Sequence, residues 1–468
     1  MSRDDSVLVA GGGMAGLVAS LMLARSGRRV RMVERDMGAA GESADDALVV
    51  RRPGVAQYHQ PHAFMPRAFT LLRDRLPDVL TTLLQHGATK ISLAPSTGES
   101  AAGDEDLIFL GARRALIEWA LRSAVHGEPN IELCPARVTG LRFEPGERAA
   151  VCGLLTDQGA LEGALVVDAM GRSSPTRRWL AAHGVAVATE TSDVGVVYYS
   201  RHYRLRDGAL VPESPSPFGP RVDHGYVSAA TFIGDSRTYC IVAMVPTWDS
   251  DLKILRRNEA FEAFCAASPA LAPLVDPRRA EAITDVLPMG ALQTVWHAFE
   301  QAHLPGLVAL GDSFCHTDPT FALGISNAFV QGAALCQASG THADADVAAA
   351  YYAQVGEELR ERFEFARDVS AARVERMRGH LIAISRAGCY PLYSLMATLS
   401  CAGLDPQIHR MAYRRHGFLD RLARFDGDEA LQQKVEKLFA QVVAGMRDAR
   451  RLDRADLLAM IENTRGNR

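Results

Sequence analysis

Three closely spaced glycines and one acid near the N-terminus are placed to hold a phosphate and a ribose. Gly11, Gly13 and Gly16 follow the pattern G-x-G-x-x-G, and Glu34 comes eighteen residues after the last of them. The first glycine permits a tight turn, the second lets the backbone approach a pyrophosphate, and the third allows a helix to pack closely on a sheet. A carboxylate at Glu34 accepts hydrogen bonds from ribose hydroxyls and repels a 2′-phosphate. This spacing predicts a dinucleotide site for a ligand other than NADP.

The predicted elements around the glycines fit a βαβ unit. Residues 6–10 form an apolar run typical of a buried strand, residues 17–26 show helical periodicity, and residues 29–33 predict a second strand. Met14 and Ala15 stand where the helix opens, so its free N–H groups and the positive end of its dipole face the anion. A glycine-rich turn without function is the alternative, and strand, helix and acid together argue against it. The pattern does not separate FAD from NAD.

Two later stretches place polar residues at the ends of apolar strands. The first strand is predicted over residues 165–168 and the second over residues 306–310. A turn follows the first strand, whereas a proline-containing loop and a helix follow the second. The candidate cofactor-binding residues in these stretches are Asp168, Gly311, Asp312, Pro319, Gly324 and Ile325.

Together the three motifs resemble the fingerprints of the class A flavoprotein monooxygenases, the family of p-hydroxybenzoate hydroxylase, and of the related flavin-dependent halogenases and geranylgeranyl reductases. The resemblance covers residues 5–340. It implies that Asp312 holds a ribityl hydroxyl of FAD. It also implies that the helix opening near Gly324 directs its N–H groups at the flavin N1–C2 edge, where reduced flavin carries negative charge. The chain departs from the family pattern at Ala169 and Ala322, where relatives often carry glycine.

The same resemblance implies further cofactor contacts. Arg114 begins a predicted helix where family members place an arginine on the FAD phosphates, although a solvated residue at a helix start is the alternative. Val138 follows a strand expected to approach the adenine, and Arg35 stands beside the ribose-binding acid. The segment of residues 51–67, which is rich in Pro and His, is expected to run past the flavin with one of its arginines in contact. The candidates for that arginine are Arg51, Arg52 and Arg67.

A second region reads as an antiparallel sheet inserted into the α/β chain. Residues 196–205 alternate, and residues 226–233 and 237–245 predict a hairpin. In the resembled family such a sheet covers the flavin and binds substrate. Because alternate residues of a strand point to opposite faces, only one face of the first strand meets the pocket, and the opposite face carries Tyr198 and His202. The candidate substrate-binding residues are Phe64, Tyr199, Arg201, Tyr203 and Phe321.

The predicted fold class is therefore α/β, with a Rossmann-like FAD-binding domain of the p-hydroxybenzoate hydroxylase and glutathione-reductase type, an inserted antiparallel-sheet substrate domain and C-terminal helices. The helices cap the sheet or pair with a second copy in a homodimer, and residues 383–399 are apolar enough to line a large pocket. In chain order, the predicted units are the FAD-binding domain at 1–185 and 286–345, with 45–100 contributing partly to the substrate side, the substrate domain at 186–285 and the helical region at 346–468.

Composition and charge exclude several other classes. A net charge of −4 and a pI near 6.4 supply no excess positive charge for nucleic acid. The apolar stretch 6–24 is interrupted by glycines, so it is not a membrane span. The eight cysteines form no C-x-x-C pair, and the pair His59 and His62 is a poor metal site because Pro61 breaks the register. No signal peptide is evident, and a cytoplasmic location is the default.

These features predict an FAD-dependent monooxygenase that inserts one oxygen atom from O2 into a bulky aromatic or polyketide-like molecule through a flavin C4a-hydroperoxide. The product is hydroxylated or epoxidised, and NADH or NADPH supplies electrons directly or through a separate reductase. For a phenolic substrate, His202 or His316 could act as base. The alternatives are an FAD-dependent reductase or dehydrogenase of a lipid-like olefin, a halogenase, for which the W-x-W-x-x-I-P stretch is missing, and a non-catalytic flavin-fold binding protein.

Overall fold

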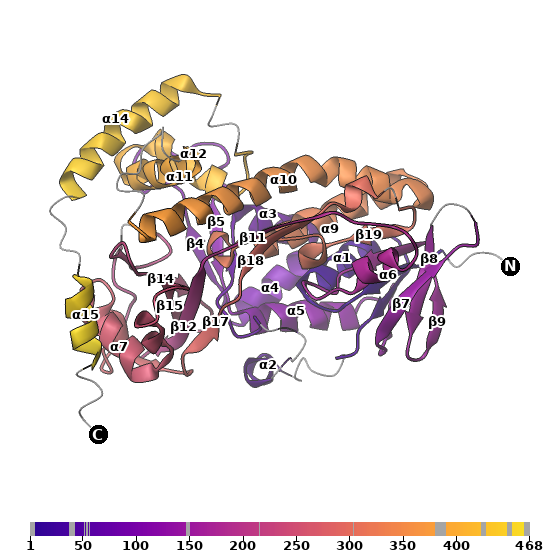
Figure 1. Ribbon diagram of the computed structural model, residues 1–468, viewed down its shortest axis with the longest axis horizontal. Helices are drawn as coiled ribbons and strands as arrows, with labels where there is room; N and C mark the ends of the chain where they lie inside the picture. Colours follow the sequence, from indigo (N-terminus) through magenta and orange to yellow (C-terminus); the bar gives the residue numbers. More distant parts are fainter. Residues whose placement is uncertain are drawn as a thin grey trace.

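The computed structural model describes residues 5–36, 43–50, 52, 55, 57–146, 150–214, 216–302, 304–379, 390–422, 427–446 and 452–462. Within these residues the chain forms a parallel sheet with helices packed on it, a separate antiparallel sheet, and a group of C-terminal helices (Figure 1). The predicted α/β architecture with an inserted antiparallel sheet is thereby confirmed. The residue limits of the three units remain predictions.

The N-terminal motif folds as the βαβ unit that its sequence predicts. Strand β1 (Val7–Ala10) leads into helix α1 (Met14–Arg25), and β2 (Val30–Val33) pairs parallel to β1. The sheet order is β19-β10-β1-β2-β6, with every neighbouring pair parallel. All residues of β1 are buried, which explains its continuous apolar sequence. The remaining strands of this sheet are β6 (Ile131–Cys134), β10 (Leu165–Asp168) and β19 (Leu307–Ala309).

Helices from distant parts of the chain pack around this sheet. Helix α9 (Leu323–Thr341) contacts both α1 and α3 (Pro66–Arg75). Helix α5 (Arg114–His126) also contacts α1. The 34-residue helix α10 (Asp344–Met377) packs on α9 and runs along the molecule to the C-terminal helices (Figure 1). The shorter helices of this region are α2 (Ala44–Val49), α4 (Pro77–Gln85) and α6 (Thr176–Ala181).

The antiparallel sheet has six strands and contains the alternating segment found in the sequence. Its order is β13-β14-β15-β12-β16, and β17 pairs with β12 beside β16. Strand β12 spans Val196–Leu205, as predicted, and its register places Tyr198 opposite Met244. Its other strands are β13 (Arg221–Asp223), β14 (Ser228–Ile233), β15 (Thr238–Pro246), β16 (Ala280–Ala282) and β17 (Leu287–Met289), and helices α7 (Asn258–Ala267) and α8 (Ala272–Val275) lie between β15 and β16 in the chain.

Three small sheets complete the strand content. One of them, β11-β18-β20, connects the two larger sheets, because β11 and β18 come directly before and after the antiparallel sheet in the chain and β20 follows β19 of the parallel sheet. Its strands are β11 (Thr189–Asp193), β18 (Gln293–His297) and β20 (Cys315–His316). The other two sheets consist of β3 (Ala63–Phe64), β4 (Thr89–Ser92) and β5 (Ile108–Gly111), and of β7 (Val138–Phe143), β8 (Val151–Thr156) and β9 (Gly159–Glu162).

The C-terminal part is helical, as expected. Helices α11 and α14 contact each other near the end of α10, whereas α15 packs on α7 at the antiparallel sheet (Figure 1). Their bounds are α11 (Tyr390–Cys401), α12 (Pro406–His416), α14 (Glu429–Met446) and α15 (Arg454–Glu462). None of the helices in the described ranges is long and apolar enough to cross a membrane.

Candidate functional site

One large cavity of about 2060 Å³ begins at the carboxyl ends of the parallel strands and reaches the antiparallel sheet. Gly11 follows β1, Glu34 follows β2, and Gly311 follows β19, and all three line it. Ligands of open α/β sheets bind at such strand ends. A pocket for one small ligand measures roughly 300–1,000 Å³. The cavity therefore has room for a dinucleotide and a second molecule.

The glycine motif forms a cradle at the first end of this cavity. Gly11 has φ +103°, and a Cβ atom there would lie 2.6 Å from the carbonyl oxygen of Ala169. At Gly13 the space a Cβ would occupy is open, and the residue lines the cavity. Gly16 does not line the cavity but packs closely on the turn, since a Cβ atom there would lie 1.9 Å from the oxygen of Gly11. The three positions thus differ in their steric surroundings, and the open space at Gly13 is where a pyrophosphate would fit.

Glu34 has a second role that its sequence position does not reveal. Its Oε2 accepts a hydrogen bond from the N–H of Gly12 at 2.6 Å, and its Oε1 accepts one from the N–H of Asp36 at 2.8 Å. The residue also lines the cavity, together with Arg35 and Val138. A carboxylate oxygen has two lone-pair sites, so each oxygen still has one with which it could accept from a ligand.

A long helix points its N-terminus into the middle of the cavity. Helix α9 has 19 residues, and Gly324 and Ile325 in its first turn line the cavity. Ala322, one of the two departures from the family pattern, precedes the helix with φ +52°. No side chain caps this end, so its N–H groups and dipole remain available to an anionic edge. The open space beside Gly324 fits a flat ring system.

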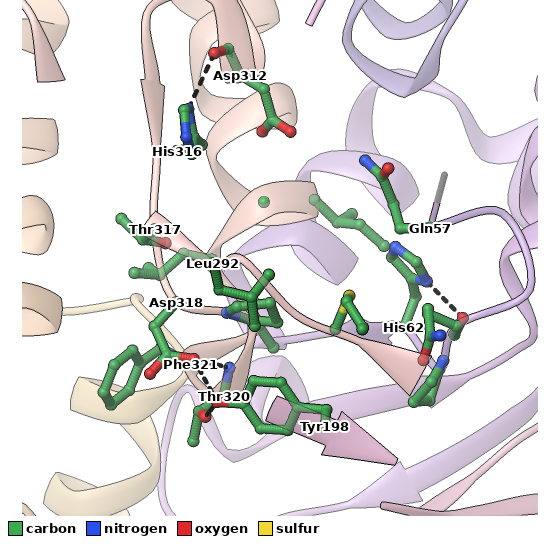
Figure 2. Close-up of a pocket in the computed structure, with 18 of the residues that line it drawn as sticks. Gln57, His62, Tyr198, Leu292, Asp312, His316, Thr317, Asp318, Thr320 and Phe321 are labelled. Carbon is green, nitrogen blue, oxygen red and sulfur yellow. Dashed lines mark hydrogen bonds between the residues drawn. The ribbon is translucent and has the colours of Figure 1, made fainter. Parts of the chain in front are cut away.

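The loop that leads to this helix supplies further cavity residues. Asp312 and His316 lie near each other, with His316 Nδ1 3.3 Å from the carbonyl oxygen of Asp312 (Figure 2). Pro319 and Phe321 belong to a 3-10 turn, and both line the cavity. Burial lowers the pKa of His316, so its imidazole is neutral near pH 7.

A cluster of buried charges lies on the other wall. Arg114 donates from Nε to Glu118 at 2.7 Å, and Arg52 pairs with the same carboxylate. Arg114 Nη1 lies 3.0 Å from His62 Nε2, while His62 Nδ1 lies 2.8 Å from the carbonyl oxygen of Gln60. Burial, and secondly the charge of Arg114, lowers the pKa of His62 to about 3. His62 is therefore neutral, accepts from Arg114 and donates to the Gln60 carbonyl.

Only one of the three candidate arginines is seen at the cavity. Arg52 lines it beside Arg114. Arg67 does not, and its backbone N–H donates to the carbonyl oxygen of Gly417 at 2.8 Å. Arg51 lies outside the described residues.

The far side of the cavity holds a buried polar cluster that sequence reasoning missed. Asp318 is fully buried, its Oδ1 accepts from Tyr198 Oη at 2.5 Å, and its Oδ2 accepts from Arg373 Nη2 at 2.6 Å. Thr320 lies next to Tyr198 (Figure 2), and its hydroxyl accepts a hydrogen bond from Arg373. Burial would raise the pKa of Asp318, but Arg373 and the hydrogen bonds hold it below its usual value. Two sequence features could have indicated this cluster. They are the motif proline directly after Asp318 and the face of β12 that carries its even-numbered residues.

Apolar side chains surround this cluster and form a chamber. They come from the antiparallel sheet, from the loop before α9, and from the ends of α10 and α11. Members of the chamber are Val242, Met244, Met289, Leu292, Phe321, Leu323, Val369, Leu392, Leu395 and Met396. Of the predicted pocket segment 383–399, residues 383–389 lie outside the described residues, and the rest contributes through α11.

The orientation of β12 corrects the expected substrate face. Tyr199 and Tyr203 pack on the far side of the sheet in an apolar cluster with Phe261 of α7. Arg201 pairs there with Glu262 at 2.8 Å, and Tyr203 Oη donates to the same side chain. The reason is that α7 covers the odd-numbered face, which leaves the even face with Tyr198 for the cavity.

Three other candidate residues also lie outside the cavity lining. Phe64 is wholly buried against Phe329, and Asp168 accepts hydrogen bonds from Ser174 Oγ at 2.6 Å and from the N–H of Met170 at 3.0 Å. His202 Nε2 lies 2.9 Å from the carbonyl oxygen of His59, and burial lowers its pKa to about 4. Asp168 therefore shapes a turn below the cavity. Of the two candidate bases, His316 is at the cavity and His202 is not.

Comparisons with known proteins agree with this geometry. The model of the NAD(P)-binding Rossmann-like domain family matches residues 9–76. A curated relative, the 3-hydroxy-4-methyl-anthranilyl-[aryl-carrier protein] 5-monooxygenase of Streptosporangium sibiricum, is 30% identical over 228 residues, which are 47% of this chain. The match spans about half of that relative, 53% of its length.

Solved structures share the fold at low sequence identity. The probable FAD-dependent monooxygenase PqsL of Pseudomonas aeruginosa is 16% identical with a TM-score of 0.58, over 81% of this chain and 100% of that one. The p-nitrophenol 4-monooxygenase PnpA of Pseudomonas putida DLL-E4 is 16% identical with a TM-score of 0.56, over 89% and 98%. The flavin-dependent brominase Bmp2 is 17% identical with a TM-score of 0.57, over 89% and 100%. The chain thus has the fold of the FAD-dependent monooxygenases, and the resemblance to the class A flavoprotein monooxygenases that its three motifs predict is confirmed at the level of the fold.

Proposed function

We propose that this chain is an FAD-dependent monooxygenase that hydroxylates a bulky aromatic molecule. The observation that carries the proposal is the single cavity that joins the glycine cradle to the apolar chamber. A dinucleotide and an aromatic ring bound in its two parts would be held against each other near the N-terminus of α9. Monooxygenases among the relative and the structural neighbours support the same reaction.

Several residues along the cavity fit FAD. The cradle at Gly13 would take the pyrophosphate, Glu34 the ribose, and Asp312 a ribityl hydroxyl, while Arg114 on the other wall would supply positive charge for the phosphates. The N-terminus of α9 at Gly324 would face the anionic edge of the flavin. When bound, FAD supplies the electron transfer and the reaction with O2 that side chains cannot. We propose that NADH or NADPH provides the electrons, either directly or through a separate reductase.

The protein's own part is to orient the substrate and to keep water out. The apolar chamber around Leu292 and Phe321 provides little solvation for a competing water molecule. His316 can accept a proton from a substrate because its imidazole is neutral and lies at the cavity. His202 cannot do so from its place against the His59 carbonyl. We therefore assign the role of base, where the substrate needs one, to His316.

The test is a comparison of electron-donor oxidation with O2 uptake by the purified protein. We expect the purified protein to show a flavin spectrum. We also expect it to oxidise NADH or NADPH and to consume O2 in step when a hydroxylated or aminated naphthalene is present. A parallel assay contains an added flavin reductase. Turnover of an olefin under anaerobic conditions would instead indicate a reductase. Protein that stays colourless with added FAD would rule out both.

The outer end of the cavity bears on whether the substrate arrives free or attached to a carrier. The curated relative is named for a substrate held on an aryl-carrier protein. In this chain the cavity extends past the chamber to Arg221, His224 and Arg376 near the edge of the antiparallel sheet and to α14. We propose that a tethered aryl group enters here while its carrier stays outside. Equal kcat/KM for a free aryl acid and for its pantetheine thioester would contradict this form of the proposal.

A further inference from the structure

Four side chains at the chamber form a closed ring of hydrogen bonds. Arg373 Nη1 donates to Thr320 Oγ1 at 3.1 Å, and Arg373 Nη2 donates to Asp318 Oδ2 at 2.6 Å. Tyr198 Oη donates to Asp318 Oδ1 at 2.5 Å and is also hydrogen-bonded to the Thr320 hydroxyl. The ring joins three elements that are far apart in the chain, namely β12, the loop before α9, and α10. Figure 2 shows its members Tyr198, Asp318 and Thr320.

The donor and acceptor roles within this ring are fixed by chemistry. A guanidinium only donates and an ionised carboxylate only accepts. Thr320 therefore accepts from Arg373 and uses its own hydrogen for Tyr198, and Tyr198 uses its hydrogen for Asp318. Burial, and secondly the charge of Asp318, raises the pKa of Tyr198 far above its usual value, so the phenol keeps that hydrogen. The ring has one consistent direction, from Arg373 to Asp318.

This direction decides what the ring offers to a ligand. A phenol oxygen has one hydrogen and two acceptor sites. In Tyr198 the hydrogen is bonded to Asp318 and one acceptor site to Thr320. Three of the five N–H hydrogens of Arg373 are bonded, to Thr320, to Asp318 and to the carbonyl oxygen of Val194, and its Nε is buried. The Tyr198 hydroxyl itself keeps one acceptor site and has no hydrogen left for a ligand.

The surroundings make the acceptor site on Tyr198 important for orienting a ligand. Tyr198 lines the cavity, and its cross-strand neighbours Met244 and Met289 line it too. Leu292 and Phe321, drawn with Tyr198 in Figure 2, are further apolar residues that line the cavity. In a mostly apolar pocket, a few placed polar groups orient the ligand.

We propose that Tyr198 is a specificity-determining residue that accepts a hydrogen bond from a neutral ring O–H or N–H2 group of the aromatic substrate. The inference rests on the proposed function and deepens it. A substrate with a carboxylate at this position is disfavoured, because two acceptors would face each other without a hydrogen between them. An aromatic ring without any polar hydrogen is bound but not oriented.

Three naphthalene probes test the acceptor in the wild-type holoenzyme. The probes are 2-naphthol, 2-methoxynaphthalene and 2-naphthoate, with binding followed by the change in flavin absorbance. Because a neutral hydrogen bond is worth about two- to tenfold in affinity, 2-naphthol should bind that much more tightly than 2-methoxynaphthalene, and 2-naphthoate most weakly. Equal affinities for the first two probes, preferential binding of 2-naphthoate, or no binding of 2-naphthol would overturn the proposal.

A matched pair of neighbouring tyrosines locates the effect. In Tyr198→Phe the preference for 2-naphthol over its methyl ether should disappear, whereas Tyr199→Phe, on the face covered by α7, should keep it. A merely structural role of Tyr198 would weaken both probes alike and leave their ratio unchanged. Flavin content and O2-coupled NAD(P)H oxidation are measured on the same samples. Failure of those two readouts would reject the proposed function. With flavin content and O2-coupled oxidation intact, a missing preference in the wild type or a preference that persists in Tyr198→Phe rejects only the role of Tyr198.

Discussion

Glu34 Oε2 accepts a hydrogen bond of 2.6 Å from the backbone N–H of Gly12, in the middle of the glycine motif. A Cβ atom at Gly12 would lie 2.9 Å from Glu34 Cγ, so the two residues are also in close steric contact. The acid after β2 therefore fixes the shape of the glycine turn in addition to facing the cavity. Two sequence features that are usually given separate roles act here as one unit.

Glu34→Gln should weaken FAD binding without unfolding the protein. Glutamine offers one acceptor oxygen, so one of the two N–H groups that Glu34 now holds would face an amide NH2. Loss of one charge-assisted hydrogen bond of this kind corresponds to roughly tenfold in affinity. Titration of the apoprotein with FAD gives the dissociation constant. Glu132→Gln, on the exposed side of β6, is the control, and the same constant for both variants would refute the role.

Gly13→Val should prevent FAD from binding. The Cβ of Gly13 meets no atom within 4 Å, so the fold tolerates a side chain there, but that side chain would fill the space proposed for the pyrophosphate. The absorbance spectrum of the purified variant measures flavin occupancy. Gly340→Val, at an open position near the end of α9 that does not line the cavity, provides the comparison. Normal occupancy in Gly13→Val would show that the cradle is not the phosphate site.

Asp312→Ala should lower the affinity for FAD by about ten- to a hundredfold. A hydrogen bond from a ribityl hydroxyl to an ionised carboxylate is worth roughly 1.5–3 kcal/mol. Asp312 lines the cavity, and its side chain lies beside His316 (Figure 2). Asp346→Ala, an exposed acid in the first turn of α10, is the matched control. An unchanged dissociation constant at Asp312 alone would place the ribityl chain elsewhere.

The stability of the protein should fall as the pH drops from 6.5, and His62 should account for one proton of the slope. Its pKa is lowered from 6.5 to about 3 in the folded state, so below pH 6.5 only the unfolded chain takes up the proton. The stabilisation is full above pH 6.5 and is lost on the way down to about pH 3. Each such group contributes about 1.4 kcal/mol per pH unit.

The measurement is urea unfolding of the holoprotein between pH 7 and pH 4.5. In His62→Gln the slope of unfolding free energy against pH should be shallower than in wild type by about one proton. His183→Gln, which removes an exposed histidine, should leave the slope unchanged. A wild-type slope in His62→Gln would mean that the folded protein protonates His62 as readily as the unfolded chain.

The sequence predicts local elements well because their signals lie within short windows. The bounds of β12 and β10 are as predicted, since alternation and a continuous apolar run mark each of them. The face of β12 that meets the cavity could not be predicted. Tyr198 and Tyr199 are identical in type, and the choice between them is made by α7, which covers one face from about sixty residues away in the chain.

The buried ion pairs at the cavity could not be predicted either, because their members are distant in the chain. Asp318 and Arg373 are 55 residues apart, and Arg52 and Glu118 are 66 apart, so neither pairing leaves a pattern in a single window. The motif acids were placed correctly as strand-end residues, but Asp168 bonds to its own turn. Residue type and strand position predict a cofactor contact for both Asp168 and Asp312, but only Asp312 lines the cavity, because of the packing around the two residues.

Met289→Trp should narrow the chamber and change substrate use while leaving FAD in place. Met289 lines the cavity on β17, across from Tyr198, and it lies away from the glycine cradle. The larger indole would occupy the space proposed for the aromatic ring, and a loss of more than tenfold in kcat/KM corresponds to at least about 1.4 kcal/mol of transition-state binding. Leu210→Trp, at a position that is 75% exposed, controls for the added indole. If Met289→Trp keeps normal flavin content and normal kcat/KM for 2-naphthol, the substrate ring must bind on the other side of the chamber, toward α11 and Met396.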